Sequence, residues 1–169
     1  MNSLFNENHI IYSLDTSALF AAFNERYPIA NFPALWCKVV ELIRKGRLKM
    51  SQVVFEEAME DSGIKLWCNQ NNLNQYFRVP VDEFVQEAVS EILTVFPKLL
   101  DDRRDKSGAD PWCIAFAQVT DNCIVVTEEN LTDSVNRPKI PDVCKHFKVE
   151  CIKVVDLIKR ENWVFNSST

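Results

Sequence analysis

Acidic side chains stand where the sequence predicts the end of a strand or the start of a helix. The positions are Asp15, Glu56 or Glu57, Asp110, and Glu129. In open α/β sheets the functional crevice lies outside the carboxyl ends of the strands, so these acids can meet at one rim. Carboxylates so close raise one another's pKa values unless a cation lies between them, and their hard oxygens favour Mg²⁺ or Mn²⁺. Such a site suits hydrolysis of a phosphodiester by a metal-activated water.

Each acid also has an ordinary structural interpretation. Asp15 could cap the helix that follows it, and Asp110 before Pro111 has the form of a helix cap. Glu56 and Glu57 could belong to a solvated helix face, and Glu129 with its neighbour Glu128 to a turn. The set of four positions, rather than any one residue, therefore indicates a metal site.

Short apolar runs that alternate with amphipathic segments must position these acids. The predicted strands are the run that ends before Asp15 and residues 48–50, 123–127 and 149–152. The predicted helices cover residues 16–26, 33–45, 52–61, 64–73, 81–96, 112–120, 142–147 and 154–160. This alternation predicts an α/β fold, a three-layer α/β/α sandwich with a central parallel sheet of about four strands. We expect residues 1–169 to form a single domain.

Composition favours a soluble, cytoplasmic protein. The content of hydrophobic residues is 47% and that of charged residues 25%, both ordinary for a globular protein. No run approaches the roughly 20 apolar residues that a membrane helix needs, and the first residues lack the features of a signal peptide. The six cysteines form no CxxC pair, so we expect free, buried thiols.

The overall charge gives no general attraction to nucleic acid. The net charge is −5, which counts against a nucleic-acid ligand unless a divalent cation neutralises part of the acidity. Basic residues are nevertheless bunched in segment 44–49 and at Arg103, Arg104 and Lys106. The second group precedes Asp110 and provides the better candidates for phosphate contacts, although its composition favours a solvated loop.

Four motifs in order along the chain carry a family resemblance. They are Leu-Asp-Thr-Ser-Ala-Leu at 14–19, Val-Val-Phe-Glu-Glu at 53–57, Gly-Ala-Asp-Pro-Trp-Cys-Ile-Ala at 108–115 and Val-Val-Thr-Glu-Glu at 125–129. This order resembles the PIN-domain nucleases, the fold of the VapC toxins of bacterial toxin–antitoxin pairs. A Tyr-Pro…Phe-Pro…Trp loop at 27–36 and Ile-Pro-Asp-Val-Cys at 140–144 resemble a PIN-like branch of that family.

The resemblance implies a role for each matched residue. The metal-binding and catalytic acids would be Asp15, Glu57, Asp110 and Glu129, with Glu57 preferred to Glu56. The hydroxyl groups of Thr16, Ser17 and Thr127 would orient the carboxylates, or alternatively cap helices and turns. PIN domains usually have Asp where this chain has Glu129, and the longer side chain changes the reach of that ligand.

The resemblance therefore predicts an endoribonuclease that depends on Mg²⁺ or Mn²⁺ and hydrolyses RNA. Its setting would resemble that of a toxin, with an antitoxin protein as candidate partner and a homodimer as candidate assembly. The longer Glu129 and the acidic balance favour an alternative, a catalytically weak or inactive PIN-like scaffold that binds protein or RNA. A phosphohydrolase with Asp15 as covalent nucleophile ranks last, because residue 17 is Ser where such enzymes carry a second Asp.

Overall fold

The computed structural model describes residues 9–100 and 108–166 of the chain. The strands in these residues are β1 (Ile11–Leu14), β2 (Leu48–Ser51), β3 (Arg78–Val79), β4 (Cys123–Val126) and β5 (Cys151–Ile152). The α-helices there are α1 (Thr16–Phe20), α2 (Pro33–Arg44), α3 (Gln52–Ala58), α4 (Ser62–Gln70), α5 (Asn74–Phe77), α6 (Glu83–Val95), α7 (Asp110–Val119), α8 (Ile140–Phe147) and α9 (Val154–Arg160). A π-helical segment η1 (Ala21–Arg26) continues α1, and a 3₁₀ segment η2 (Pro97–Leu100) follows α6.

The strands form one parallel sheet in the order β3-β2-β1-β4-β5. The chain builds outward from the central β1 to β2 and β3, and then crosses to the other side of β1 to add β4 and β5. Strand order therefore reverses between β1 and β4, where Leu14 is in register with Val126. The carboxyl ends of two strands on either side of such a reversal form the usual ligand crevice of an open α/β sheet.

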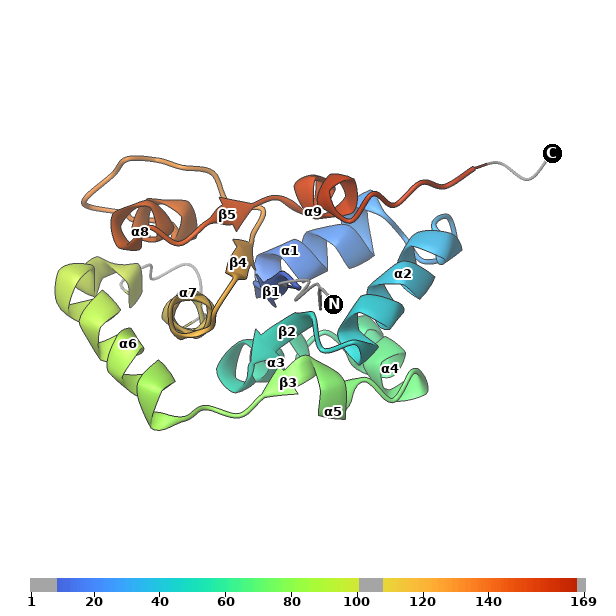
Figure 1. The fold of residues 1–169 in the computed structure, drawn as a ribbon, viewed down its shortest axis with the longest axis horizontal. Helices are drawn as coiled ribbons and strands as arrows, with labels where there is room; N and C mark the ends of the chain where they lie inside the picture. The colour runs from blue at the N-terminus through green and yellow to red at the C-terminus, as the bar shows by residue number, and fades with distance from the viewer. Residues whose placement is uncertain (1–8, 101–107, 167–169) are drawn as a thin grey trace, which may run out of the picture.

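Helices cover both faces of the sheet, which confirms the predicted α/β/α sandwich. Helices α6, α7 and α8 lie on one face, and α1, α2 and α9 lie on the other (Figure 1). The central strands are buried from both sides, so Tyr12 and Val125 are inaccessible to solvent. Helix α7 packs between α6 and the sheet, and its residues Cys113, Ile114 and Ala115 are also fully buried.

Some local features differ from the sequence-based expectations. The sheet contains β3, a strand that was not predicted, because its two residues are too few to produce a recognisable apolar pattern. The helix expected over residues 16–26 changes to a π-helix at Ala21. Asp110 occupies the first turn of α7 rather than its cap, which is Ala109. In the described parts of the chain no helix is long and apolar enough to cross a membrane.

Candidate functional site

Asp15 lies at the point where strand order reverses. Its backbone N–H donates to the carbonyl of Val126 at 3.0 Å, which fixes the residue between the ends of β1 and β4. Its side-chain Oδ2 accepts hydrogen bonds from the hydroxyls of Ser17 and, at 3.0 Å, of Thr127. Asp15 is the N-cap residue of α1, but its carboxylate accepts no hydrogen bond from a backbone N–H of that helix.

The surroundings of Asp15 disfavour its ionised form. Only 3% of the residue is exposed, and burial is the main reason that its pKa rises to about 6. The negative charges of Glu129 and Glu57 raise this pKa further, whereas the two hydroxyl donors lower it. Within the described residues, Oδ1 accepts no hydrogen bond and the side chain forms no ion pair. Asp15 therefore has an oxygen that no described residue binds, which leaves it able to bind another ligand.

Asp110, in the first turn of α7, is affected by the same negative charges. Burial, followed by the charges of Asp15, Glu129 and Glu57, raises the pKa of Asp110 to about 8. Its position is set by α7, which a buried hydrogen bond of 2.8 Å from the hydroxyl of Ser13 to the carbonyl of Cys113 holds against β1. The carboxylates of Asp15 and Asp110 thus come from adjacent elements and repel each other.

The structure distinguishes Glu57 from Glu56. Glu57 accepts a 2.9 Å hydrogen bond from the hydroxyl of Thr16, which joins α3 to α1, and its charge raises the pKa of Asp15 and Asp110. Glu56 is exposed and accepts a hydrogen bond from Gln52 in the preceding turn of the same helix. Helical geometry turns adjacent residues about 100° apart, so only one of the pair can face the rim.

Glu129 contributes charge to the rim but is also bound elsewhere. Its Oε2 accepts a 2.8 Å hydrogen bond from the backbone N–H of Ile140, the first residue of α8, and its Oε1 lies 3.5 Å from the ammonium of Lys139. The first contact is favourable because the start of a helix carries partial positive charge, and the second because it joins opposite charges. The side chain expected to be a metal ligand therefore also anchors α8.

The neighbouring Glu128 does the same for α9. It accepts a 3.0 Å hydrogen bond from the backbone N–H of Val154, the first residue of that helix, and forms an ion pair with Arg26. The ammonium of Lys153 donates to the carbonyls of Glu128 at 2.6 Å and Glu129 at 2.8 Å. These contacts hold the segment after β4, which carries Glu129. We call Asp15, Glu57, Asp110 and Glu129 together the acidic rim.

The sequence analysis did not identify two of these positioning residues, Ser13 and Lys153. Ser13 is a polar residue within an apolar strand, a signal that could have singled it out as a buried hydrogen-bonding group. Lys153 donates to the carbonyls of Glu128 and Glu129, which are more than 20 residues away in sequence. No local sequence pattern predicts such a contact. The predicted phosphate contacts Arg103, Arg104 and Lys106 lie outside the described residues.

The donor set suits a hard divalent cation, although the side chains do not surround one as they stand. Across residues 9–100 and 108–166 no three Asp, Glu, His or Cys side chains are close enough together to hold a metal ion. The chemistry nevertheless fits, because Asp15 and Asp110 both have raised pKa values and form no ion pair with a described residue. A divalent cation would remove the repulsion that raises them.

Comparison with curated proteins finds no match to this chain. A family model described as a domain of unknown function (DUF4411) matches residues 12–165, which include the whole sheet from Tyr12 of β1 and all four acids of the rim. Because the match spans most of the sequence, the chain belongs to the DUF4411 family.

Proposed function

We propose that this protein is a nuclease that uses Mg²⁺ or Mn²⁺ to hydrolyse RNA phosphodiesters. One observation carries the proposal. At the β1–β4 reversal, the charges of Glu57 and Glu129 raise the pKa values of both Asp15 and Asp110, and the charge of Asp15 also raises that of Asp110. Strongly raised carboxylate pKa values are typical of functional sites. The resemblance of the four acidic motifs to those of PIN-domain nucleases supports the same conclusion.

The residues of the rim have separate tasks in this proposal. Asp15 and Asp110, assisted by Glu57, supply the carboxylate oxygens that hold the cation, and Ser17 with Thr127 fixes the orientation of Asp15. Thr16 fixes Glu57 in the same way. Glu129 adds negative charge while it keeps α8 in place. When bound, a divalent cation would activate a water molecule and stabilise charge on the phosphoryl oxygens.

The proposed setting is that of a toxin–antitoxin pair, in which an antitoxin protein covers the rim and two copies of the chain form a homodimer. This setting is supported by the resemblance to the VapC toxins. A protein of net charge −5 gains little from general attraction to RNA, so binding would depend on the cation and on local basic groups.

A second candidate function is a PIN-like scaffold without catalysis. It is favoured by the contacts of Glu129, both of whose carboxylate oxygens already face partners at the start of α8. It is also favoured because no three of the described acidic side chains are placed to hold a metal ion. Metal binding distinguishes the two functions.

The test combines calorimetry with a cleavage assay. The nuclease proposal expects saturable Mn²⁺ binding, and Mn²⁺-dependent cleavage of a labelled single-stranded RNA that stops on addition of EDTA. Asp15→Asn should reduce cleavage by at least about 100-fold, because the cation loses its central ligand. The variant should stay folded by circular dichroism, since the amide oxygen can still accept from Ser17 and Thr127.

A matched pair of variants controls for general loss of acidity. Glu57→Gln should lower cleavage and weaken Mn²⁺ binding, whereas Glu56→Gln on the exposed side of the same helix should change neither. Equal cleavage by the wild type and Asp15→Asn would contradict the nuclease proposal. Absence of saturable binding at millimolar Mn²⁺ would favour the scaffold, and cleavage of a matched DNA strand at the same rate would contradict the choice of RNA.

A further inference from the structure

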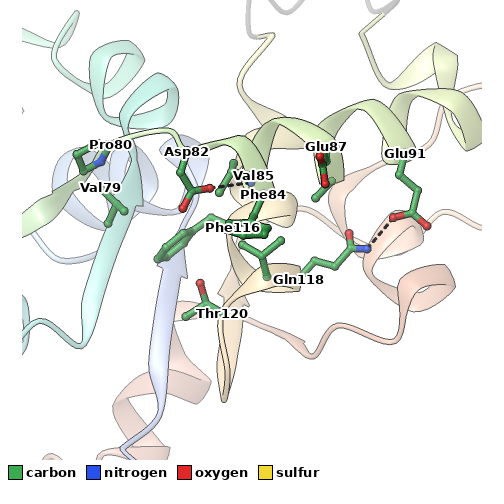
Figure 2. Close-up of a pocket in the computed structure, with 12 residues that line it drawn as sticks. Val79, Pro80, Asp82, Phe84, Val85, Glu87, Glu91, Phe116, Gln118 and Thr120 are labelled. Atoms are coloured by element: carbon green, nitrogen blue, oxygen red, sulfur yellow. Dashed lines mark hydrogen bonds between the residues drawn. The ribbon is translucent and has the colours of Figure 1, made fainter.

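A groove of about 600 Å³ lies between the start of α6 and the end of α7. Its apolar residues include Phe84 and Val85 of α6 and Phe116 of α7 (Figure 2). Val119 of α7 also lines it. Phe84 is 61% exposed and Val119 is 41% exposed, although both are large apolar side chains. Neighbouring exposed apolar side chains within a cavity of this size are typical of a binding surface.

The charged groups along this groove are all negative. Asp82, Glu87 and Glu91 line it, and its twelve lining residues include no Lys, Arg or His. Glu87 lies four residues from both Glu83 and Glu91 on α6, a spacing at which like charges destabilise a helix. Glu87 forms no hydrogen bond or ion pair with any residue in the described part of the chain. A positively charged ligand would therefore relieve repulsion within α6.

Gln118 adds an unsatisfied hydrogen-bonding group to the groove. Its amide nitrogen donates to Glu91 at 3.2 Å, as Figure 2 shows, and this contact orients the amide because a carboxylate can only accept. The amide oxygen is buried and accepts no hydrogen bond from the residues that the structure describes. A buried acceptor without a donor costs free energy, which an N–H group that reached this oxygen would recover.

The geometry points to this groove as the docking site for a basic peptide segment of a partner protein, with an apolar side chain against Phe84 and Lys or Arg side chains beside Glu87 and Glu91. The apolar floor excludes a purely polar cation as the best ligand, and the line of carboxylates selects positive charge. A peptide also brings the N–H donors that the oxygen of Gln118 lacks.

The groove is separate from the acidic rim. Asp110 begins α7 and Val119 ends it, so the two surfaces lie at opposite ends of a 10-residue helix, about 15 Å apart along its axis. Docking at the groove therefore leaves the rim free, and it does not depend on the nuclease proposal.

The test measures the fluorescence anisotropy of a labelled peptide, Arg-Leu-Arg-Lys-Leu-Arg with blocked ends, on titration with the full-length protein. We expect saturable binding that weakens by at least about tenfold in Glu87→Lys, since the groove then repels the ligand. Phe84→Ala should weaken binding by about tenfold through loss of the apolar anchor. Both side chains are exposed, and Glu87→Lys removes like-charge repulsion, so neither change should unfold the chain.

Matched changes elsewhere separate the groove from general effects. Glu60→Lys alters the net charge equally at an exposed residue outside the groove, and Leu66→Ala removes an exposed apolar side chain of α4; both should bind the peptide as the wild type does. A peptide with Ser in place of both Leu residues should bind about tenfold more weakly.

Several outcomes would overturn the inference. Loss of peptide binding in Asp15→Asn but not in Glu87→Lys would place the peptide at the acidic rim. Equal binding of the Ser-substituted peptide, or of spermine, would indicate attraction by charge alone. Concentration-dependent dimerisation in analytical ultracentrifugation that Phe84→Ala abolishes would identify a second copy of the chain as the occupant.

Discussion

The two ends of β1 differ in whether buried charges lie beside opposite charges or beside like charges. Beyond the amino-terminal end, the hydroxyl of Tyr12 donates to Glu161 at 2.6 Å, and Arg47 donates to both carboxylate oxygens of Glu161 at 2.6 and 2.7 Å. At the carboxyl end, Asp15 and Asp110 share a field of negative charge and form no ion pair with a described residue.

The pKa values record this contrast. Burial tends to raise the pKa of Glu161, but hydrogen bonds from Arg47 and Tyr12 hold it below its ordinary value. Burial and like charges act together at Asp110 and raise its pKa to about 8. The first cluster joins α9 to the sheet, whereas the second destabilises the fold unless a ligand neutralises it. Paired charges that stabilise the fold can therefore be distinguished from repelling charges by their partners.

Glu161→Ala should have the largest effect on stability. It leaves the guanidinium of Arg47, which is mostly buried, without its carboxylate, and the free energy of unfolding should fall by about 3 kcal/mol. Urea denaturation measures the change. Glu150→Ala is the matched control, because Glu150 pairs with Arg160 on the surface and its loss should cost less than about 1 kcal/mol. Equal losses in the two variants would contradict the distinction between buried and exposed pairs.

Asp110→Asn should stabilise the protein in EDTA, the opposite of the usual effect of a buried substitution. The unfolded carboxyl loses its proton near pH 4, whereas the folded one keeps it to about pH 8, so the folded state binds more protons in this interval. The free energy of unfolding should therefore fall as pH rises from about 4 to about 8. At pH 8 the variant should exceed the wild type by about 1–3 kcal/mol.

Thermal melts across this pH range measure the slope directly. The pKa of Asp15 is about 6, so this group also lowers the free energy of unfolding as pH rises, but only up to about pH 6. Asp110→Asn should therefore reduce the slope mainly above pH 6. Mn²⁺ should flatten the wild-type curve and leave that of the variant nearly unchanged. A wild-type stability that rises between pH 5 and 8 in EDTA would refute the electrostatic account of the rim.

Ser13→Ala should have the smallest effect of the three changes. It removes the buried hydrogen bond that holds α7, and so Asp110, against β1, at a cost of about 1 kcal/mol. Ser90→Ala removes a similar hydroxyl-to-carbonyl bond from an exposed helix face and should change stability by less than about 0.5 kcal/mol. If the Ser13 bond positions Asp110, Ser13→Ala should also weaken Mn²⁺ binding, which a merely structural role would leave unchanged.

Local patterns account for the parts of the molecule that could be predicted. Apolar runs such as the one before Asp15 predicted the buried core strands, and helix α9 follows its amphipathic pattern over residues 154–160. The two-residue β3 and the change from α1 to η1 could not be predicted, because pairing with β2 and packing of the neighbouring helices decide them. The predicted metal ligands remain predictions, although their side chains do share one electrostatic field.

The sequence by itself determined the α/β fold and the edge of the sheet at which the acids gather. Strand and helix periodicity are properties of neighbouring residues, and parallel strands place their carboxyl ends together. Tertiary structure alone decided that Glu57 rather than Glu56 faces the rim, that Glu129 anchors α8 and that Glu161 is paired with Arg47. Burial and partners give a carboxylate its pKa and its role, and both depend on residues far away in the chain.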